Sequence, residues 1–195
     1  MRKVSLGVVL LAVLLGLGTG AGVAQAGKPP ATVYLIRHAE KPAGKEDINL
    51  TPVGFKRAGL IPLLFNPPAA SGRVALPKPD AIFATHRSKH SDRPYETVAP
   101  LGQALNLPVN HEYLEEDYPA LARLLLSGQY AGKVVLVAWH HGVLPQFAKE
   151  FGVTPPYTPW PDTQFDRIWR IDWPAGGGAP VITDIPQFIL PGDSK

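Results

Sequence analysis

The sequence contains no cysteine. This absence excludes disulfide bonds, thiol nucleophiles, thiolate zinc sites, iron–sulfur clusters and a lipid anchor on cysteine. With 195 residues, the chain is long enough to bury a substantial apolar core. Its stability must therefore rest on that core rather than on covalent cross-links.

The sequence also lacks a strong charge of either sign and any run of basic residues. The formal net charge is +3, and Arg2 and Lys3 supply two of those charges. Proteins that bind nucleic acid by neutralising its phosphates usually carry a basic stripe or patch. Nucleic acid is therefore not an expected partner.

The longest apolar run lies at the N-terminus. Two basic residues precede the apolar stretch 4–17, and residues 24–26 (Ala-Gln-Ala) match the small-residue pattern of a signal-peptidase site. The stretch contains glycine and is shorter than the ~20 residues that cross a bilayer, which disfavours the alternative of a membrane anchor. We expect 1–26 to be a cleaved signal peptide and 27–195 to form one domain. That domain would be periplasmic or secreted, without stable insertion in a membrane.

Short apolar runs alternate with helical segments along the remaining chain. Runs rich in β-branched or aromatic residues predict buried strands at 32–36, 81–84, 134–138 and 167–171, with a candidate edge strand at 180–185. Helices are predicted at 52–65 (capped by Thr51 and interrupted by Pro62), 93–105 (disturbed by Pro100), 119–127 and 144–151 (followed by Gly152). This order predicts an α/β sandwich.

Arginine and histidine residues follow three of the predicted strands. Arg37 and His38 follow the first strand, the segment THRSKHSDRP (85–94) follows the second, and His140 and His141 follow the third. Ligands of open α/β sheets bind at the carboxyl ends of the strands. Guanidinium groups bind phosphate through paired hydrogen bonds, and imidazole can act as a nucleophile. The pattern therefore favours a phosphoryl-transfer site at this edge.

The motifs in this order resemble the histidine phosphatase superfamily, the phosphoglycerate-mutase-like phosphatases, and in particular its RHAEK-type branch. The resemblance covers roughly residues 32 to 169. It is carried by LIRHAEK (35–41), LTPVGFKRA (50–58), ATHRSKHSDRPYETVAPL (84–101), VVLVAWHHGVLP (134–145) and FDRIW (165–169). It implies a three-layer α/β sandwich with a mainly parallel central sheet.

The resemblance also implies roles for individual residues. His38 would be the nucleophile that forms a phosphohistidine, Arg37 and Arg93 would bind the phosphoryl oxygens, and a second histidine would complete the clamp. Water would then release phosphate, with no metal and no organic cofactor. The implied partner is a small phosphorylated substrate, which the enzyme would hydrolyse as a phosphomonoester.

Two assignments stay open in the sequence. His140 matches the position of the second histidine without gaps, whereas relatives that have tryptophan at the position of Trp139 favour His141, and we prefer His141. The proton donor could be Glu115 or Glu116, which lie between Arg93 and the histidine pair.

Two other functions are alternatives. The first is a metal hydrolase with histidine ligands, although the chain has neither His-x-x-x-His on one helix nor Glu-x-x-His. The second is an envelope protein that binds a phosphorylated ligand without catalysis.

Overall fold

The computed structural model describes residues 27–44 and 47–194, so the predicted signal peptide, 1–26, lies outside the described residues. The strands are β1 (Thr32–Arg37), β2 (Ala81–Ala84), β3 (Val109–Asn110), β4 (Val134–Trp139), β5 (Arg167–Asp172) and β6 (Val181–Pro186). The α-helices are α1 (Pro52–Leu60), α2 (Pro62–Phe65), α3 (Arg93–Leu105), α4 (Tyr118–Leu126) and α5 (Leu144–Glu150), and two short 3₁₀ helices are η1 (Ala69–Ser71) and η2 (Glu115–Asp117).

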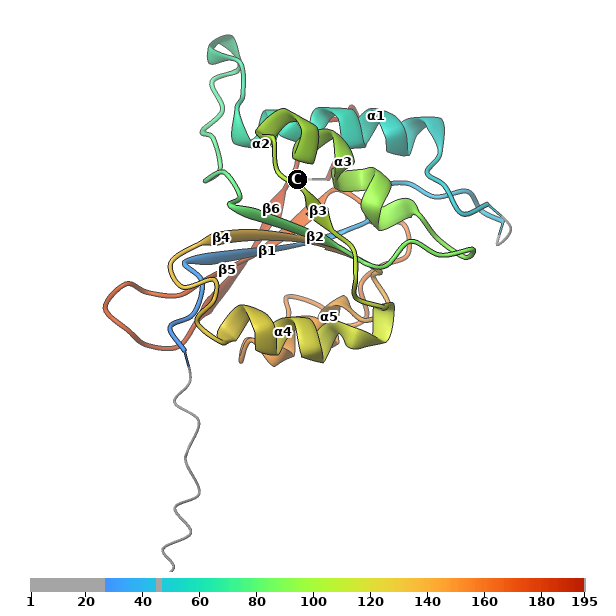
Figure 1. Ribbon diagram of the computed structural model, residues 1–195. Coiled ribbons are helices and arrows are strands. Elements are labelled where there is room, and N and C mark those ends of the chain that lie inside the picture. Colours follow the sequence, from blue (N-terminus) through green and yellow to red (C-terminus); the bar gives the residue numbers. More distant parts are fainter. Residues whose placement is uncertain (1–26, 45–46, 195) are drawn as a thin grey trace, which may run out of the picture.

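The strands form one sheet in the order β3-β2-β4-β1-β5-β6. β1 and β2 each pair in parallel with β4, and β3 pairs in parallel with β2. β5 runs antiparallel to β1, and β6 runs antiparallel to β5. Helices α1, α2 and α3 cover one face of the sheet and α4 and α5 cover the other (Figure 1). The molecule is therefore a three-layer α/β sandwich, as predicted.

The two faces of the sheet explain why the central strands are apolar nearly throughout. In β1, Val33 and Leu35 belong to the core cluster that contains Leu121 of α4 and Phe147 of α5. The alternate residues Tyr34 and Ile36 belong to the cluster on the α1–α3 side. Successive side chains of a strand point to opposite faces, and both faces here are covered.

Local signals set the ends of several helices. Thr51 caps α1 by accepting a hydrogen bond from the Gly54 amide (3.1 Å), and Pro52 occupies the first turn. The predicted helix 52–65 is divided before Pro62 into α1 and α2, since proline cannot donate the hydrogen bond that continues a helix. Gly152, at φ 77°, follows the end of α5.

The predicted strands and helices all occur, with ends shifted by at most one residue. β3 was not predicted because two residues are too few to give a periodic signal. Contrary to the expected disturbance at Pro100, α3 continues through that residue. None of the helices in the described ranges is long and apolar enough to cross a membrane.

Candidate active site

The parallel strands β1 and β4 bring two predicted motifs to one edge of the sheet. Arg37 pairs in register with Trp139, and the His38 amide donates to the Trp139 carbonyl at 3.0 Å. His38 and His140 therefore leave adjacent strands at the same level, and their ring centroids are 5.4 Å apart. The ring centroid of His141 lies farther from that of His38, at 6.3 Å.

His38 is held in one tautomer. Its Nδ1 lies 2.7 Å from the carbonyl oxygen of Ala39, which can only accept, so Nδ1 carries the proton and Nε2 carries the lone pair when the ring is neutral. Burial lowers the pKa of His38 well below its usual value, the bond to Ala39 opposes this effect, and nearby His140, Arg37 and Arg93 lower it further. At neutral pH the ring is therefore uncharged, and the lone pair of Nε2 is available for nucleophilic attack.

Arg37 is buried, and only part of its guanidinium has partners. Its Nη1 donates to the backbone carbonyls of Pro161 (3.0 Å), Asp162 (2.7 Å) and Gln164 (3.2 Å). Its Nε and Nη2 have no hydrogen-bond partner among the residues that the structure describes. Phe165 stacks on the guanidinium, with Cζ 3.9 Å from the ring centroid.

The charge of Arg37 matters for what this site can bind. Burial lowers the pKa of Arg37 to about 10, so the group remains cationic at neutral pH. A buried cation with unused donors is costly unless an anion accompanies it. The group is therefore suited to bind an anion beside His38.

Helix α3 supplies the second arginine. Arg93 lies in its first turn, and its Nη1 donates to the Asp47 carbonyl at 2.8 Å, whereas its Nε has no partner in the described part of the chain. One turn later, the buried Thr97 hydroxyl donates to the Arg93 carbonyl (2.7 Å) and accepts from the Ala39 amide (2.9 Å). Thr97 thus fixes α3 against the turn that carries His38.

The two histidines after β4 lie on different sides of the site. His140 lines a cavity of about 390 Å³ together with Arg93 and Glu115. Nε2 of His141 instead lies 2.7 Å from Oδ1 of the exposed Asp162. Its Nδ1 is buried and has no hydrogen-bond partner among residues 27–44 and 47–194. Burial and then Arg93 lower the pKa of His140 to about 4, with smaller contributions from His141 and two further cations.

Both predicted proton donors line the same cavity as His140. The pKa of Glu115 is raised by its partial burial and by the adjacent Glu116, while Arg93 opposes the rise. The backbone carbonyl of Glu115 accepts from Trp139 Nε1 at 3.0 Å, which ties η2 to the end of β4. The environment of Glu115 therefore favours a protonated carboxyl group.

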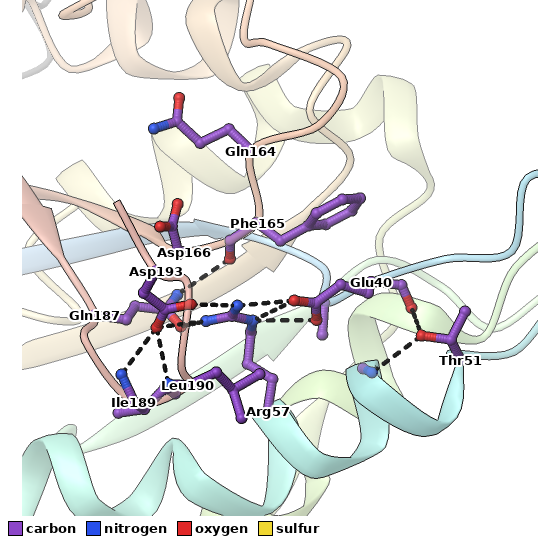
Figure 2. Close-up of polar contacts among 12 residues, drawn as sticks. Glu40, Thr51, Arg57, Gln164, Phe165, Asp166, Gln187, Ile189, Leu190 and Asp193 are labelled. Atoms are coloured by element: carbon purple, nitrogen blue, oxygen red, sulfur yellow. Dashed lines mark hydrogen bonds and ion pairs between the residues drawn. The ribbon is translucent and has the colours of Figure 1, made fainter. Parts of the chain in front are cut away.

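A larger cavity of about 750 Å³ lies near the C-terminal segment, and none of the predicted site residues lines it. Its buried charges are already paired. Figure 2 shows the guanidinium of Arg57 between the carboxylates of Glu40 and Asp193. Its Nη2 lies 2.7 Å from one oxygen of each carboxylate. Asp166 accepts from the Ser194 hydroxyl at 2.7 Å. The buried arginine of this cavity is thus already paired with two carboxylates, whereas Arg37 and Arg93 keep nitrogens without a partner among the described residues.

Sequence reasoning missed two residues that contact the predicted ones: Thr97 and Phe165. The spacing of Arg93 and Thr97 was visible in the sequence, but not the bond to the Ala39 amide, which joins residues 58 positions apart. His86 and His90 line the rim of the smaller cavity, while Arg87 pairs with Asp92 at 2.7 Å. Within the described ranges, no three His, Asp or Glu side chains are arranged to hold a metal ion.

No family model matches the chain, and no curated protein matches it in sequence. Solved structures share its fold. A phosphoserine phosphatase from Entamoeba histolytica, in complex with 3-phosphoglyceric acid, gives a TM-score of 0.54 at 17% identity, over 82% of this chain and 99% of that one. A mycobacterial glucosyl-3-phosphoglycerate phosphatase, in complex with inorganic phosphate, gives 0.52 at 12% identity, over 78% and 95%. At such identities the likeness shows the fold, which confirms the predicted phosphoglycerate-mutase-like class.

Proposed function

We propose that the chain is an exported, metal-independent histidine phosphatase that hydrolyses a small phosphomonoester through a phosphohistidine on His38. The observation that carries the proposal is the tautomer of His38, whose Nδ1 bonds to the Ala39 carbonyl and leaves Nε2 as nucleophile. The unpartnered nitrogens of Arg37 and Arg93 support it as donors for phosphoryl oxygens. The shared fold with two phosphatases gives independent support.

The first step would transfer the phosphoryl group to the enzyme. Nε2 of His38 attacks phosphorus, and the bond from phosphorus to the ester oxygen breaks. The departing oxygen takes a proton from Glu115, whose raised pKa suits a general acid. Arg37 and Arg93 neutralise the charge that spreads over the equatorial oxygens.

The second step would regenerate the enzyme. A water molecule attacks the phosphorus of the phosphohistidine and gives a proton to the Glu115 carboxylate. The phosphorus–nitrogen bond breaks, and its electron pair returns to Nε2 of His38. We assign His140 rather than His141 to the clamp, because its ring is nearer to His38 and it lines the cavity with Arg93.

Labelling with a ³²P-phosphomonoester tests the nucleophile. The wild-type protein should acquire acid-labile, base-stable label, and His38→Ala should lose both the label and the activity. His111→Gln is the matched control, since His111 does not line the cavity beside His140. A wild-type protein that neither labels nor hydrolyses an aryl phosphate would refute the enzyme proposal and favour the phosphate-binding alternative.

Treatment with a chelator distinguishes the proposed mechanism from the metal-hydrolase alternative. A phosphohistidine mechanism with arginine clamps needs no divalent cation, so activity should persist after dialysis against EDTA. Loss of activity that zinc restores would support the alternative instead. Export is tested by expressing the full chain in a bacterial host and sequencing the N-terminus of the exported protein, which should begin at Gly27.

A further inference from the structure

Most of the residues that line the cavity beside His140 have polar side chains. Among the described residues that line it, Leu114 is the one apolar side chain, and it is half exposed. The volume of about 390 Å³ is near the lower end of the ~300–1,000 Å³ that ligand pockets usually span. The cavity is therefore suited to a small hydrophilic group rather than to a lipid chain.

Two hydroxyl groups in its wall have unused hydrogen-bonding capacity. Thr85 and Ser91 are 2% and 6% exposed, both line the cavity, and neither side-chain oxygen has a partner in the part of the chain that the structure describes. A buried hydroxyl without a partner costs free energy, and most are satisfied by protein, water or ligand. A hydroxyl can donate and accept, so it complements the hydroxyl groups of an alcohol.

The fixed charges of the cavity are unequal. Arg93 is its one permanently charged cation among the described residues, and in the proposed reaction this group faces the phosphoryl oxygens. Of the two acidic residues in the wall, Glu115 is the proposed proton donor, so Glu116 is the acidic side chain that remains. An additional anionic group on the substrate would lie near Glu116, and the described lining residues offer no second permanently charged cation to neutralise it. Like charges placed together oppose binding.

Resting on the proposed function, we infer that this cavity holds the leaving group and selects a small hydroxylated alcohol without a negative charge of its own. Glu116 is a specificity-determining residue that rejects phosphomonoesters carrying a carboxylate or a second phosphate. Thr85 and Ser91 contribute hydrogen bonds to the accepted alcohols.

Two compounds with the same skeleton test the inference. sn-Glycerol 3-phosphate carries a hydroxymethyl group where 3-phosphoglycerate carries a carboxylate. At pH 8, kcat/KM should be at least about tenfold higher for the first compound, which corresponds to ~1.4 kcal/mol. Glu116→Gln should lower the ratio of the two kcat/KM values toward one. Glu116→Lys should lower it further or reverse the preference. Glu150→Gln, which removes an exposed carboxylate at the end of α5, is the control and should leave the ratio unchanged.

Binding of both compounds to the wild type and the Glu116 variants is measured in parallel by isothermal titration calorimetry. If neither compound nor an aryl phosphate is hydrolysed, the proposed function fails, and the binding ratio still tests the selectivity. Equal values for the two compounds in the wild type, by rate and by binding, would overturn the inference. A ratio that both Glu116 variants leave unchanged would also overturn it.

Discussion

At the scale of single residues, the two histidines that follow β4 lie on different sides of the site. Trp139 belongs to the core on the α4–α5 side, and the next residue, His140, lies toward α3 and Arg93. His141 falls on the opposite side and pairs with Asp162. The sequence preference for His141 depended on the neighbouring tryptophan, which carries no information about direction, whereas the geometry favours His140.

Alanine variants of the two histidines should therefore differ in activity. His140→Ala should lower kcat/KM by about 10²–10³-fold, the usual effect of removing one group that stabilises transition-state charge. His141→Ala should cost about tenfold or less, because the ring sits beside Asp162 and farther from His38. Steady-state hydrolysis of an aryl phosphate measures both variants. If kcat/KM falls further in His141→Ala than in His140→Ala, His141 rather than His140 completes the phosphate clamp.

The depressed pKa of His140 predicts a pH dependence of stability. The folded pKa is about 4, below the usual 6.5, so between these pH values the unfolded chain binds a proton that the folded protein excludes. The free energy of unfolding should therefore fall as the pH drops from 6.5 toward 4, by about 1–3 kcal/mol from this group.

Urea unfolding at pH 7 and pH 5 tests this dependence. Other groups titrate in the same window, so the informative quantity is the difference between wild type and His140→Gln. The variant should lose less stability between the two pH values than the wild type, whereas His90→Gln, which changes an exposed ring, should behave as the wild type. An identical loss in wild type and His140→Gln would contradict the prediction.

At the scale of secondary-structure elements, the first turn of α3 is coupled to the turn after β1 through one hydroxyl group. Thr97 accepts from the Ala39 amide and donates to the Arg93 carbonyl, so it links the residue after the proposed nucleophile to the helix turn that carries the second arginine. Thr97 is buried, so no water replaces either bond if the hydroxyl is removed.

Thr97→Val keeps the shape of the side chain and removes the hydroxyl. The variant should lose about 1–3 kcal/mol of unfolding free energy, because the Ala39 amide is left without a partner. Its kcat/KM should also fall, since Arg93 and His38 are no longer held together. Thr97→Ser, which restores the hydroxyl, should recover most of the activity even if it loses some packing. A Thr97→Val enzyme with normal kinetics would show that α3 is positioned by packing alone.

Elements were predictable here to the extent that their signals are local. Proline and threonine at the start of α1, and apolar runs in β1 and β4, act over a few residues and gave the correct type and near-correct ends. The two-residue β3 exists only because it pairs with β2, which is a tertiary contact. The contact between Phe165 and Arg37 likewise joins residues 128 positions apart in the chain, so no short-range sequence pattern predicts it.

At the scale of the whole molecule, one buried ion network attaches the C-terminal segment to the turn after β1 that carries His38. Asp193 accepts from the amides of Ile189 and Leu190 and pairs with Arg57 of α1. Arg57 in turn pairs with Glu40, two residues after His38, and donates to Gln187 at 3.0 Å. This gives Glu40 a function that its sequence position did not reveal. The network connects the C-terminal segment, α1 and the end of β1 (Figure 2).

Removing the central cation should therefore affect both stability and catalysis. Arg57→Met keeps much of the side-chain volume but leaves the buried Asp193 carboxylate and the Glu40 carboxylate uncompensated, which should cost about 3–5 kcal/mol in urea unfolding. Arg123→Met, which replaces an exposed arginine on α4, should change the free energy of unfolding by less than about 0.5 kcal/mol.

Since Glu40 follows the proposed nucleophile closely, Arg57→Met should also lower kcat/KM at a temperature where the variant remains folded. Adding Glu40→Gln to Arg57→Met should recover part of the lost stability, because it removes one uncompensated charge; no recovery would show that the arginine stabilises the fold through Asp193 alone.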